Sequence, residues 1–136
     1  METVRLPSDI KNIPSECFSS CYSLKSITIP NSVEKIDDSA FPYCSSITSV
    51  TIPDSVKEIG SGAFYWCEEL SEVIGANNVE RIGYNAFGDT AFTNSNGSYE
   101  NGVLYVGKVL YKTIDGINGD IKINNLELLF NRIDVD

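Results

Sequence analysis

The 136-residue sequence predicts a repeat solenoid, built mostly of short β-strands joined by turns and short helical arcs. The first observation is self-similarity at a spacing of 23 residues, which aligns residues 6–28, 29–51, 52–74 and 75–97 without gaps. The second is that apolar residues recur in the same columns of this alignment. These columns are Phe18, Phe41, Phe64 and Phe87; Ile13, Ile36, Ile59 and Ile82; and Ile10, Val33, Val56 and Val79. Such a spacing is typical of stacked coils, each of which buries its apolar face against the next.

Each repeat is predicted to have three parts. The first is an extended segment such as residues 24–29, rich in β-branched residues and ended by Pro30. The second is a short extended piece, residues 33–36, with apolar ends and a charged middle. The third is a compact segment around Ala40 and Phe41, which we expect to be a helical turn or an irregular arc. In a parallel stack each Phe would then pack on the next one.

Two charged columns alternate in sign along the repeats. They are Lys11, Glu34, Lys57 and Glu80, and beside them Asn12, Lys35, Glu58 and Arg81. Residues of one column would be direct neighbours across the stack, where opposite charges stabilise the register. We therefore expect these charges to maintain the stack rather than to bind a ligand.

The repeat pattern weakens after Phe87. Residues 91–101 are rich in Asn, Ser and Gly and predict a loop, and residues 103–112 predict a β-hairpin with its turn at Gly107 and Lys108. A further strand is expected at residues 120–124. These features divide the chain into a solenoid of about four coils (1–97) and a hairpin with a partial terminal repeat (98–136), within one domain.

Residues 1–7 match residues 24–30, so we expect this chain to be a piece of a longer solenoid. An open coil at either end would favour self-association, because unpaired strand edges are templates for pairing. The first residues lack the basic start and apolar middle of a signal peptide.

Composition limits the classes of function. The chain is 42% hydrophobic, which supports a buried core, and its net charge is −9. The acidity argues against a nucleic-acid partner, and no apolar run approaches the length of a membrane span, so membrane insertion is not expected. The chain has no His, the commonest general base, and its acidic pairs fall at coil turns. We therefore predict that it is not an enzyme and holds no cofactor.

The repeat resembles the treponema-type, or BspA-like, leucine-rich repeats of bacterial surface proteins. Their pattern is Cys-x-x-Leu, a strand, Ile-Pro, an apolar pair and Ala-Phe, as in Cys21 to Leu24, Ile29-Pro30 and Ala40-Phe41. The likeness covers residues 1–92, and the hairpin extends it to about residue 112. The chain departs from the pattern at residues 75–76, where Ile-Pro is missing, and beyond residue 124, so the stack could break at these two places.

The resemblance implies a curved, right-handed, leucine-rich-repeat-like superhelix that binds a protein or glycan ligand. It also implies a parent protein that is secreted or on the cell surface, with a role in adhesion, and it supplies no catalytic residues. The alternatives are a structural spacer with no binding site of its own and, least favoured, an enzyme.

Two groups of exposed residues are candidates for binding. The first group contains aromatic residues outside the core columns, which are Tyr22, Tyr43, Tyr65 and Trp66. The second group is the polar face of the strands, which carries Lys25, Thr28, Thr48, Thr51, Ser71 and Glu72. The aromatic group could instead pack laterally over the arc, and the strand face could be an ordinary solvated surface.

The cysteines form a column of their own at Cys21, Cys44 and Cys67, with Cys17 in the column of small residues. Spacings of 23 residues match no zinc motif. Buried free thiols, a disulfide between stacked neighbours and a metal site remain as interpretations, with the first favoured.

Overall fold

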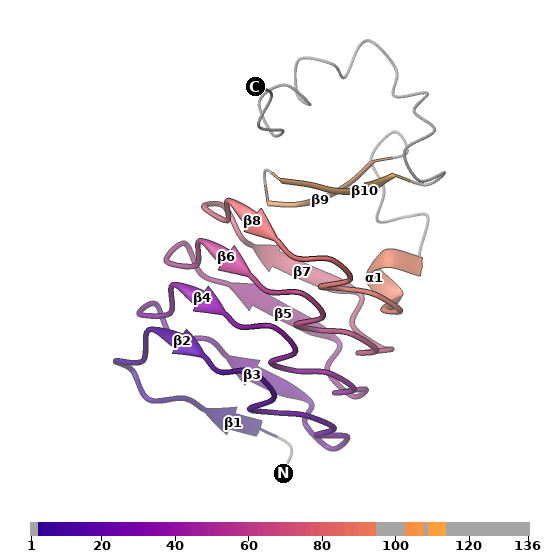
Figure 1. Cartoon of the computed structure of the whole chain (residues 1–136). Helices are drawn as coiled ribbons and strands as arrows, with labels where there is room; N and C mark the ends of the chain where they lie inside the picture. The colour runs from indigo at the N-terminus through magenta and orange to yellow at the C-terminus, as the bar shows by residue number, and fades with distance from the viewer. Residues whose placement is uncertain (1–2, 95–102, 108, 114–136) are drawn as a thin grey trace.

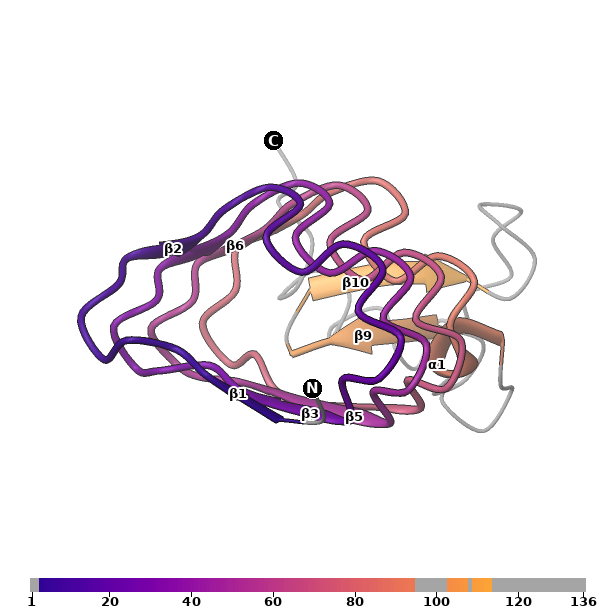
Figure 2. The same ribbon diagram turned by 90° about the horizontal axis from the view of Figure 1, so that it is seen from below.

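The computed structural model describes residues 3–94, 103–107 and 109–113, which form a solenoid of short strands wound in successive coils (Figure 1). The strands are β1 (Thr3–Arg5), β2 (Asn12–Ile13), β3 (Ser26–Thr28), β4 (Lys35–Ile36), β5 (Ser49–Ile52), β6 (Glu58–Ile59), β7 (Glu72–Gly75), β8 (Arg81–Ile82), β9 (Val103–Val106) and β10 (Val109–Thr113), and the one helix of these residues is α1 (Ala91–Asn94). Seen along the stack in Figure 2, the coils nearly overlie one another. The predicted fold class, a solenoid of mostly short strands, is confirmed.

Strand pairing follows the repeat. Strands β2, β4, β6 and β8 form one parallel sheet, in which Ile36 pairs with Ile13 on one side and Ile59 on the other. On another side of the coil β1 pairs with β3, and β5 pairs with β7, all in parallel. Each pair of partners is 23 residues apart, so one repeat makes one coil and equivalent side chains lie in contact along the stack.

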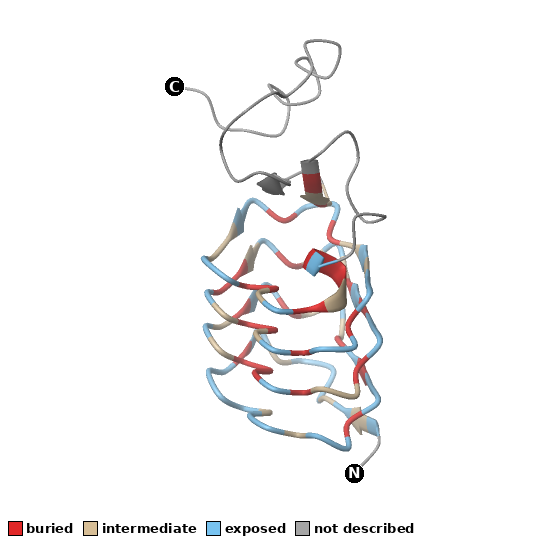
Figure 3. Cartoon of the chain, turned by 90° about the vertical axis from the view of Figure 1, so that its right-hand side faces the viewer, coloured by how far each residue is buried: buried red, intermediate tan, exposed pale blue. Residues whose placement is uncertain are grey.

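The core is a column of stacked phenylalanines. Phe41, Phe64 and Phe87 are fully buried. The ring centroids of successive phenylalanines, starting from Phe18, lie 5.1, 5.0 and 5.2 Å apart, and the planes are within 7° of parallel. Alanines line the same path, and the backbone N–H of Phe41 donates to the Ala63 carbonyl at 2.7 Å. The prediction that each Phe packs on the next is confirmed, and Figure 3 shows the buried residues running up the inside of the coils.

The third part of each repeat is an irregular arc of turns rather than a helical turn. Backbone N–H groups of Ser39, Phe41 and Tyr43 donate to carbonyls of the next coil at 2.7–2.8 Å. Two columns of the arc have positive φ in every coil, with values of 52–62°. They are Glu16, Ser39, Gly62 and Asn85, and Ser20, Tyr43, Trp66 and Asp89. The arc therefore turns through left-handed backbone positions that most side chains disfavour.

The charged columns meet across the coils as expected. Lys11 Nζ lies 3.6 Å from a carboxylate oxygen of Glu34, and Lys35 Nζ lies 3.8 Å from one of Glu58. Lys35 is also 3.9 Å from Asp37. These pairs are well exposed, so each contributes less than about 1 kcal/mol and serves mainly to favour the correct register.

The stack does not break at residues 75–76. Gly75 pairs with Ile52 at the end of β7, and the Ala76 N–H donates to the Ile52 carbonyl at 2.8 Å. Gly75 has φ +85°, and a Cβ on it would collide with that carbonyl oxygen. A glycine at this position therefore lets the chain continue the coil without the Ile-Pro pair.

The expected loop at residues 91–101 begins instead with helix α1. The hydroxyls of Thr90 and Thr93 are buried and both donate to the Phe87 carbonyl, at 2.8 and 3.0 Å. Thr90 Oγ1 also accepts the Thr93 N–H at 3.2 Å, which caps the short helix. The helix places Phe92 edge-on against Phe87, with centroids 5.7 Å apart. Residues 95–101 lie outside the described residues.

The predicted hairpin is present. Strands β9 and β10 pair antiparallel, and Gly107 in the turn has φ +59°. Leu104 and Val106 of β9 are buried, so the hairpin lies over the last coil and closes the core at that end, as Figure 1 shows. The strand expected at residues 120–124 and the last residues of the chain lie outside the described part. No helix of the described residues is long and apolar enough to cross a membrane.

Candidate functional site

Three of the four predicted aromatic residues form one cluster on the arcs. The rings of Tyr43 and Trp66 are roughly parallel, at 20°, with centroids 6.5 Å apart. Tyr65 meets both of them edge-on, at 6.0 and 6.1 Å, with interplanar angles near 80°. Tyr43 remains 42% exposed and Trp66 37% exposed, while Tyr65 is half-buried. We call these three residues the aromatic cluster.

The backbone of two residues of the cluster, Tyr43 and Trp66, lies in the left-handed region. Tyr43 and Trp66 have φ of 62° and 59°, and the same column holds Ser20 and Asp89 in the flanking coils. Small polar residues are the usual occupants of this region after glycine, whereas a bulky side chain there costs about 1–2 kcal/mol. Gly88 leaves room for Tyr65, because a Cβ on it would lie only 3.0 Å from the Tyr65 ring.

Tyr22 lies apart from the cluster. It is 60% exposed, and its backbone carbonyl accepts the Ser46 hydroxyl at 2.6 Å. Sequence reasoning missed two other exposed apolar side chains, Tyr84 (83%) and Ile74 (45%). The repeat alignment could have indicated their exposure. Tyr84 aligns with the polar residues Asp38 and Ser61, and Ile74 aligns with Thr51, whose column faces outward.

The six predicted residues of the strand face are all exposed. Thr28, Thr51 and Glu72 are on β3, β5 and β7, and Lys25, Thr48 and Ser71 immediately precede these strands. The Thr48 carbonyl accepts the backbone N–H of Ser71 at 2.9 Å. Thr28 and Thr51 also line a shallow hollow of about 470 Å³ that extends to Asp54 and Asn77. The structure thus brings this set together on one face, separate from the aromatic cluster.

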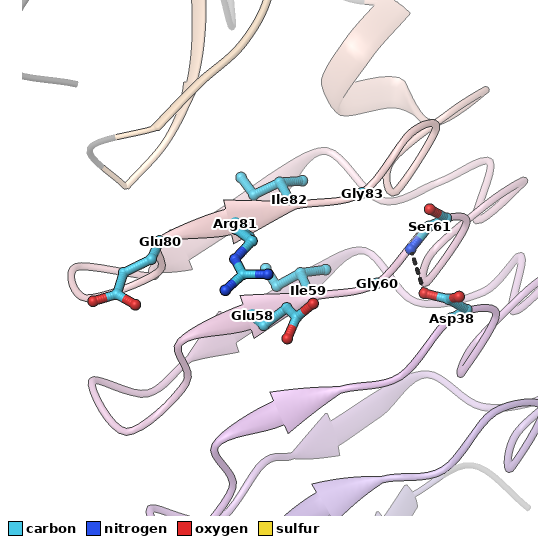
Figure 4. A pocket seen from close by; sticks show the side chains of 9 residues that line it. All are labelled: Asp38, Glu58, Ile59, Gly60, Ser61, Glu80, Arg81, Ile82 and Gly83. Atoms are coloured by element: carbon cyan, nitrogen blue, oxygen red, sulfur yellow. Dashed lines mark hydrogen bonds between the residues drawn. The ribbon is translucent and has the colours of Figure 1, made fainter. Parts of the chain in front are cut away.

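A second hollow, of about 380 Å³, was not anticipated from the sequence (Figure 4). Its charged lining is Asp38, Glu58, Glu80 and Arg81. In Figure 4 the Arg81 side chain reaches from β8 toward Glu58 on β6. Glycines 60 and 83 form its floor, and a Cβ on either would collide with the backbone of the neighbouring coil. The hollow therefore follows from the close approach of the coils, which requires glycine there.

All four cysteines are free thiols. Cys44 and Cys67 are buried, and their thiols donate to the carbonyls of Phe18 and Phe41 at 2.9 and 3.1 Å. The neighbouring Cys44 thiol, together with burial, raises the pKa of Cys67, so that its thiol stays protonated. Cys21 is half-buried, and Cys17, at the end of the stack, is exposed. The buried thiols therefore satisfy backbone carbonyls of the arcs.

Among the described residues, no group of three or more His, Cys, Asp and Glu side chains is arranged to hold a metal ion. What the described surface offers is two outward features, the aromatic cluster and the polar strand face. Each includes equivalent positions of neighbouring coils, Tyr43 with Trp66 and Thr28 with Thr51, so these side chains lie one coil apart.

Two solved bacterial structures share this architecture at about a quarter sequence identity. A leucine-rich repeat protein from Bacteroides ovatus ATCC 8483 superposes with a TM-score of 0.63 at 26% identity, over 65% of this chain and 23% of that one. The T. pallidum leucine-rich repeat protein TpLRR superposes with a TM-score of 0.55 at 27% identity, over 64% of this chain and 54% of that one. This chain thus corresponds to about a quarter and about half of the two proteins.

The pneumococcal vaccine antigen PcpA has the same fold, with a TM-score of 0.53 at 19% identity over 81% of this chain and 34% of that one. A comparison with curated protein sequences finds no match. The BspA type leucine-rich repeat region, in six copies, matches residues 1–113, which includes the coils and the hairpin. The chain belongs to the BspA-type leucine-rich repeat family.

Proposed function

We propose that this chain is a non-enzymatic binding module of a secreted or cell-surface leucine-rich repeat protein, which contacts a protein or glycan through the solenoid surface. The observation that carries the proposal is the aromatic cluster. Tyr43 and Trp66 keep 42% and 37% of their surface exposed although they occupy positions where small polar residues would fit the backbone better. Exposed Tyr and Trp are the side chains most enriched at the centres of binding surfaces.

The polar strand face is the second surface that supports binding. Its threonines and serines present hydroxyls one coil apart, about 4.8 Å, which suits a contact built from many weak interactions. The surface location of the parent protein rests on the resemblance to BspA-like proteins. The family match supports a repeat scaffold.

The test compares two double variants of the same chain. Tyr43→Ala/Trp66→Ala removes the aromatic cluster, and Thr28→Glu/Thr51→Glu places charges on the strand face. Each is the control for the other, because both change exposed side chains of neighbouring coils on different sides of the solenoid. Binding to a glycan array and to immobilised extracellular proteins is measured, with circular dichroism to verify folding.

We expect the aromatic variant to lose binding by about tenfold or more, since two central aromatic contacts are each worth about 1–2 kcal/mol. The strand-face variant should lose less binding, because the individual contacts of the threonines are weaker than those of the aromatic rings. If the unmodified chain binds no ligand, or if neither variant alters binding, the chain is a spacer and the proposal fails.

A further inference from the structure

In the described coils, basic side chains are confined to the strands and their flanks, whereas acidic side chains also occur on the arcs. The four arcs, residues 13–23, 36–46, 59–69 and 82–92, contain no Lys or Arg. Their acidic residues are Glu16, Asp37, Asp38, Glu68, Glu69 and Asp89. Every Lys and Arg of residues 3–94 lies outside the arcs, on or beside the strands. The arc face therefore carries negative charge and no Lys or Arg of its own, although Lys35 from the neighbouring strand lies 3.9 Å from Asp37.

The large exposed apolar side chains are concentrated on the arcs. Of the five large apolar residues exposed among the described residues, four are on the arcs: Tyr22, Tyr43, Trp66 and Tyr84. All four are aromatic, and aromatic faces attract cations as well as apolar groups. The arc face thus combines the two features that recognise a cationic side chain, which are an aromatic surface and carboxylates.

The two features meet at Trp66. The backbone N–H of Trp66 donates to the Gly88 carbonyl at 2.9 Å. Asp89, which follows Gly88 and occupies the same column as Trp66, therefore lies on the adjacent coil. Glu68 and Glu69 follow Trp66 on its own coil, and all three carboxylates are exposed. A guanidinium held against the indole would therefore have carboxylates on the same coil and on the adjacent coil with which to pair.

We propose that the arc face around the aromatic cluster binds a basic polypeptide segment, whose Arg or Lys side chains contact Trp66 and Tyr43 and pair with Glu68, Glu69 and Asp89. This inference rests on the proposed binding function and names its partner class. A neutral glycan fits the surface less well. Tyr65 stands at 81–82° to its two neighbours, so the three rings do not form one flat platform for a sugar ring. The carboxylates would accept hydrogen bonds from sugar hydroxyls but would form no ion pair with an uncharged ligand.

The experiment uses the single tryptophan of the chain, Trp66, as the reporter. A short Gly/Ser peptide with evenly spaced arginines is titrated into the protein, and Trp66 fluorescence is followed at low and at physiological salt. The matched probe is the same peptide with citrulline in place of arginine, which keeps the shape and removes the charge. We expect the arginine peptide to bind and to weaken with salt, and the citrulline peptide to bind at least tenfold more weakly.

Two double variants that remove the same number of carboxylates test whether the arginine peptide binds beside Trp66. Glu68→Gln/Glu69→Gln removes two carboxylates beside Trp66, and Glu34→Gln/Glu80→Gln removes two from the charged column at the strands. The first should weaken the arginine peptide about three- to tenfold, because each exposed carboxylate contributes a fraction of a kcal/mol, and the second by less than twofold. Equal effects of the two variants, or equal binding of the two peptides, would overturn the inference.

The failure of this inference can be told from the failure of the proposed function. If oligosaccharides or neutral proteins bind through Tyr43 and Trp66 while the arginine peptide does not, the binding function stands and the basic partner is wrong. If the arginine peptide fails and no array ligand binds either, both are wrong.

Discussion

Replacing Phe64 with alanine should destabilise the solenoid more than any comparable change at its end. Phe64 is fully buried and has stacked rings on both sides, at 5.0 and 5.2 Å. Truncating such a side chain costs about 3–5 kcal/mol in transfer and cavity energy. Phe18 is half-buried and has a stacked partner on one side at 5.1 Å, so its truncation should cost about half as much. The difference follows from the position in the stack, because the residue type is the same.

Urea denaturation followed by Trp66 fluorescence measures both variants. With an m value of about 1.5 kcal/mol/M, a loss of about 4 kcal/mol lowers the midpoint by about 2–3 M for Phe64→Ala, against about 1–1.5 M for Phe18→Ala. Domains are stable by only about 5–15 kcal/mol, so Phe64→Leu, with an expected cost of about 1–1.5 kcal/mol, is the variant to use if Phe64→Ala does not fold. Equal midpoints for the alanine variants at positions 18 and 64 would refute the stacking argument.

Three other predictions concern the thiols, the coil spacing and the edge of the stack. Iodoacetamide at pH 8 should modify exposed Cys17 and leave Cys67 unmodified until the chain unfolds, as mass spectrometry would show; early modification of Cys67 would contradict its burial. Gly60→Ala should cost about 1–3 kcal/mol in thermal or urea unfolding, since the new methyl group meets the backbone of Asp38, whereas Ser61→Ala, at an exposed neighbour, should be nearly neutral. Strand β1 pairs with β3 on one side and with no other strand of the described residues, so sedimentation should show self-association at high concentration that Val4→Lys reduces; a monomer at every concentration would refute it.

The core could be predicted from the sequence because residues 23 positions apart occupy the same place on successive coils and are therefore neighbours. Once Phe41 and Phe64 share a column, their contact follows from the coil spacing alone. The same reasoning placed the Lys11–Glu34 and Lys35–Glu58 pairs and the buried thiols of Cys44 and Cys67 correctly. Cys21, expected in the same buried column, is only half-buried. The exposed strand-face set was found in the same way, since outward columns alternate with inward ones along a strand.

Features that depend on backbone dihedrals could not be predicted in this way. The column of Tyr43 and Trp66 gives no glycine signal for its positive φ, and only Ser20 and Asp89 at the same position hint at it. Helix α1 begins where Thr90 and Thr93 bind the Phe87 carbonyl, within a stretch whose composition indicates a loop. Contacts of a single coil decide the helix, and a repeat average hides them. The positive φ recurs in every coil, but no glycine in its column marks it.

The energetics of the aromatic cluster favour the proposed binding module over a spacer. The left-handed backbone at Tyr43 and Trp66 lowers the folding stability by about 1–2 kcal/mol for each residue. Each stacked or edge-on ring pair raises it by about 0.5–1.5 kcal/mol. The cluster is thus close to neutral for folding, unlike the phenylalanine column. Ser20 and Asp89 show that a small polar residue completes the same coil turn. A spacer would need nothing more at this column, so the two exposed aromatic side chains there are the observation on which the proposed binding function rests.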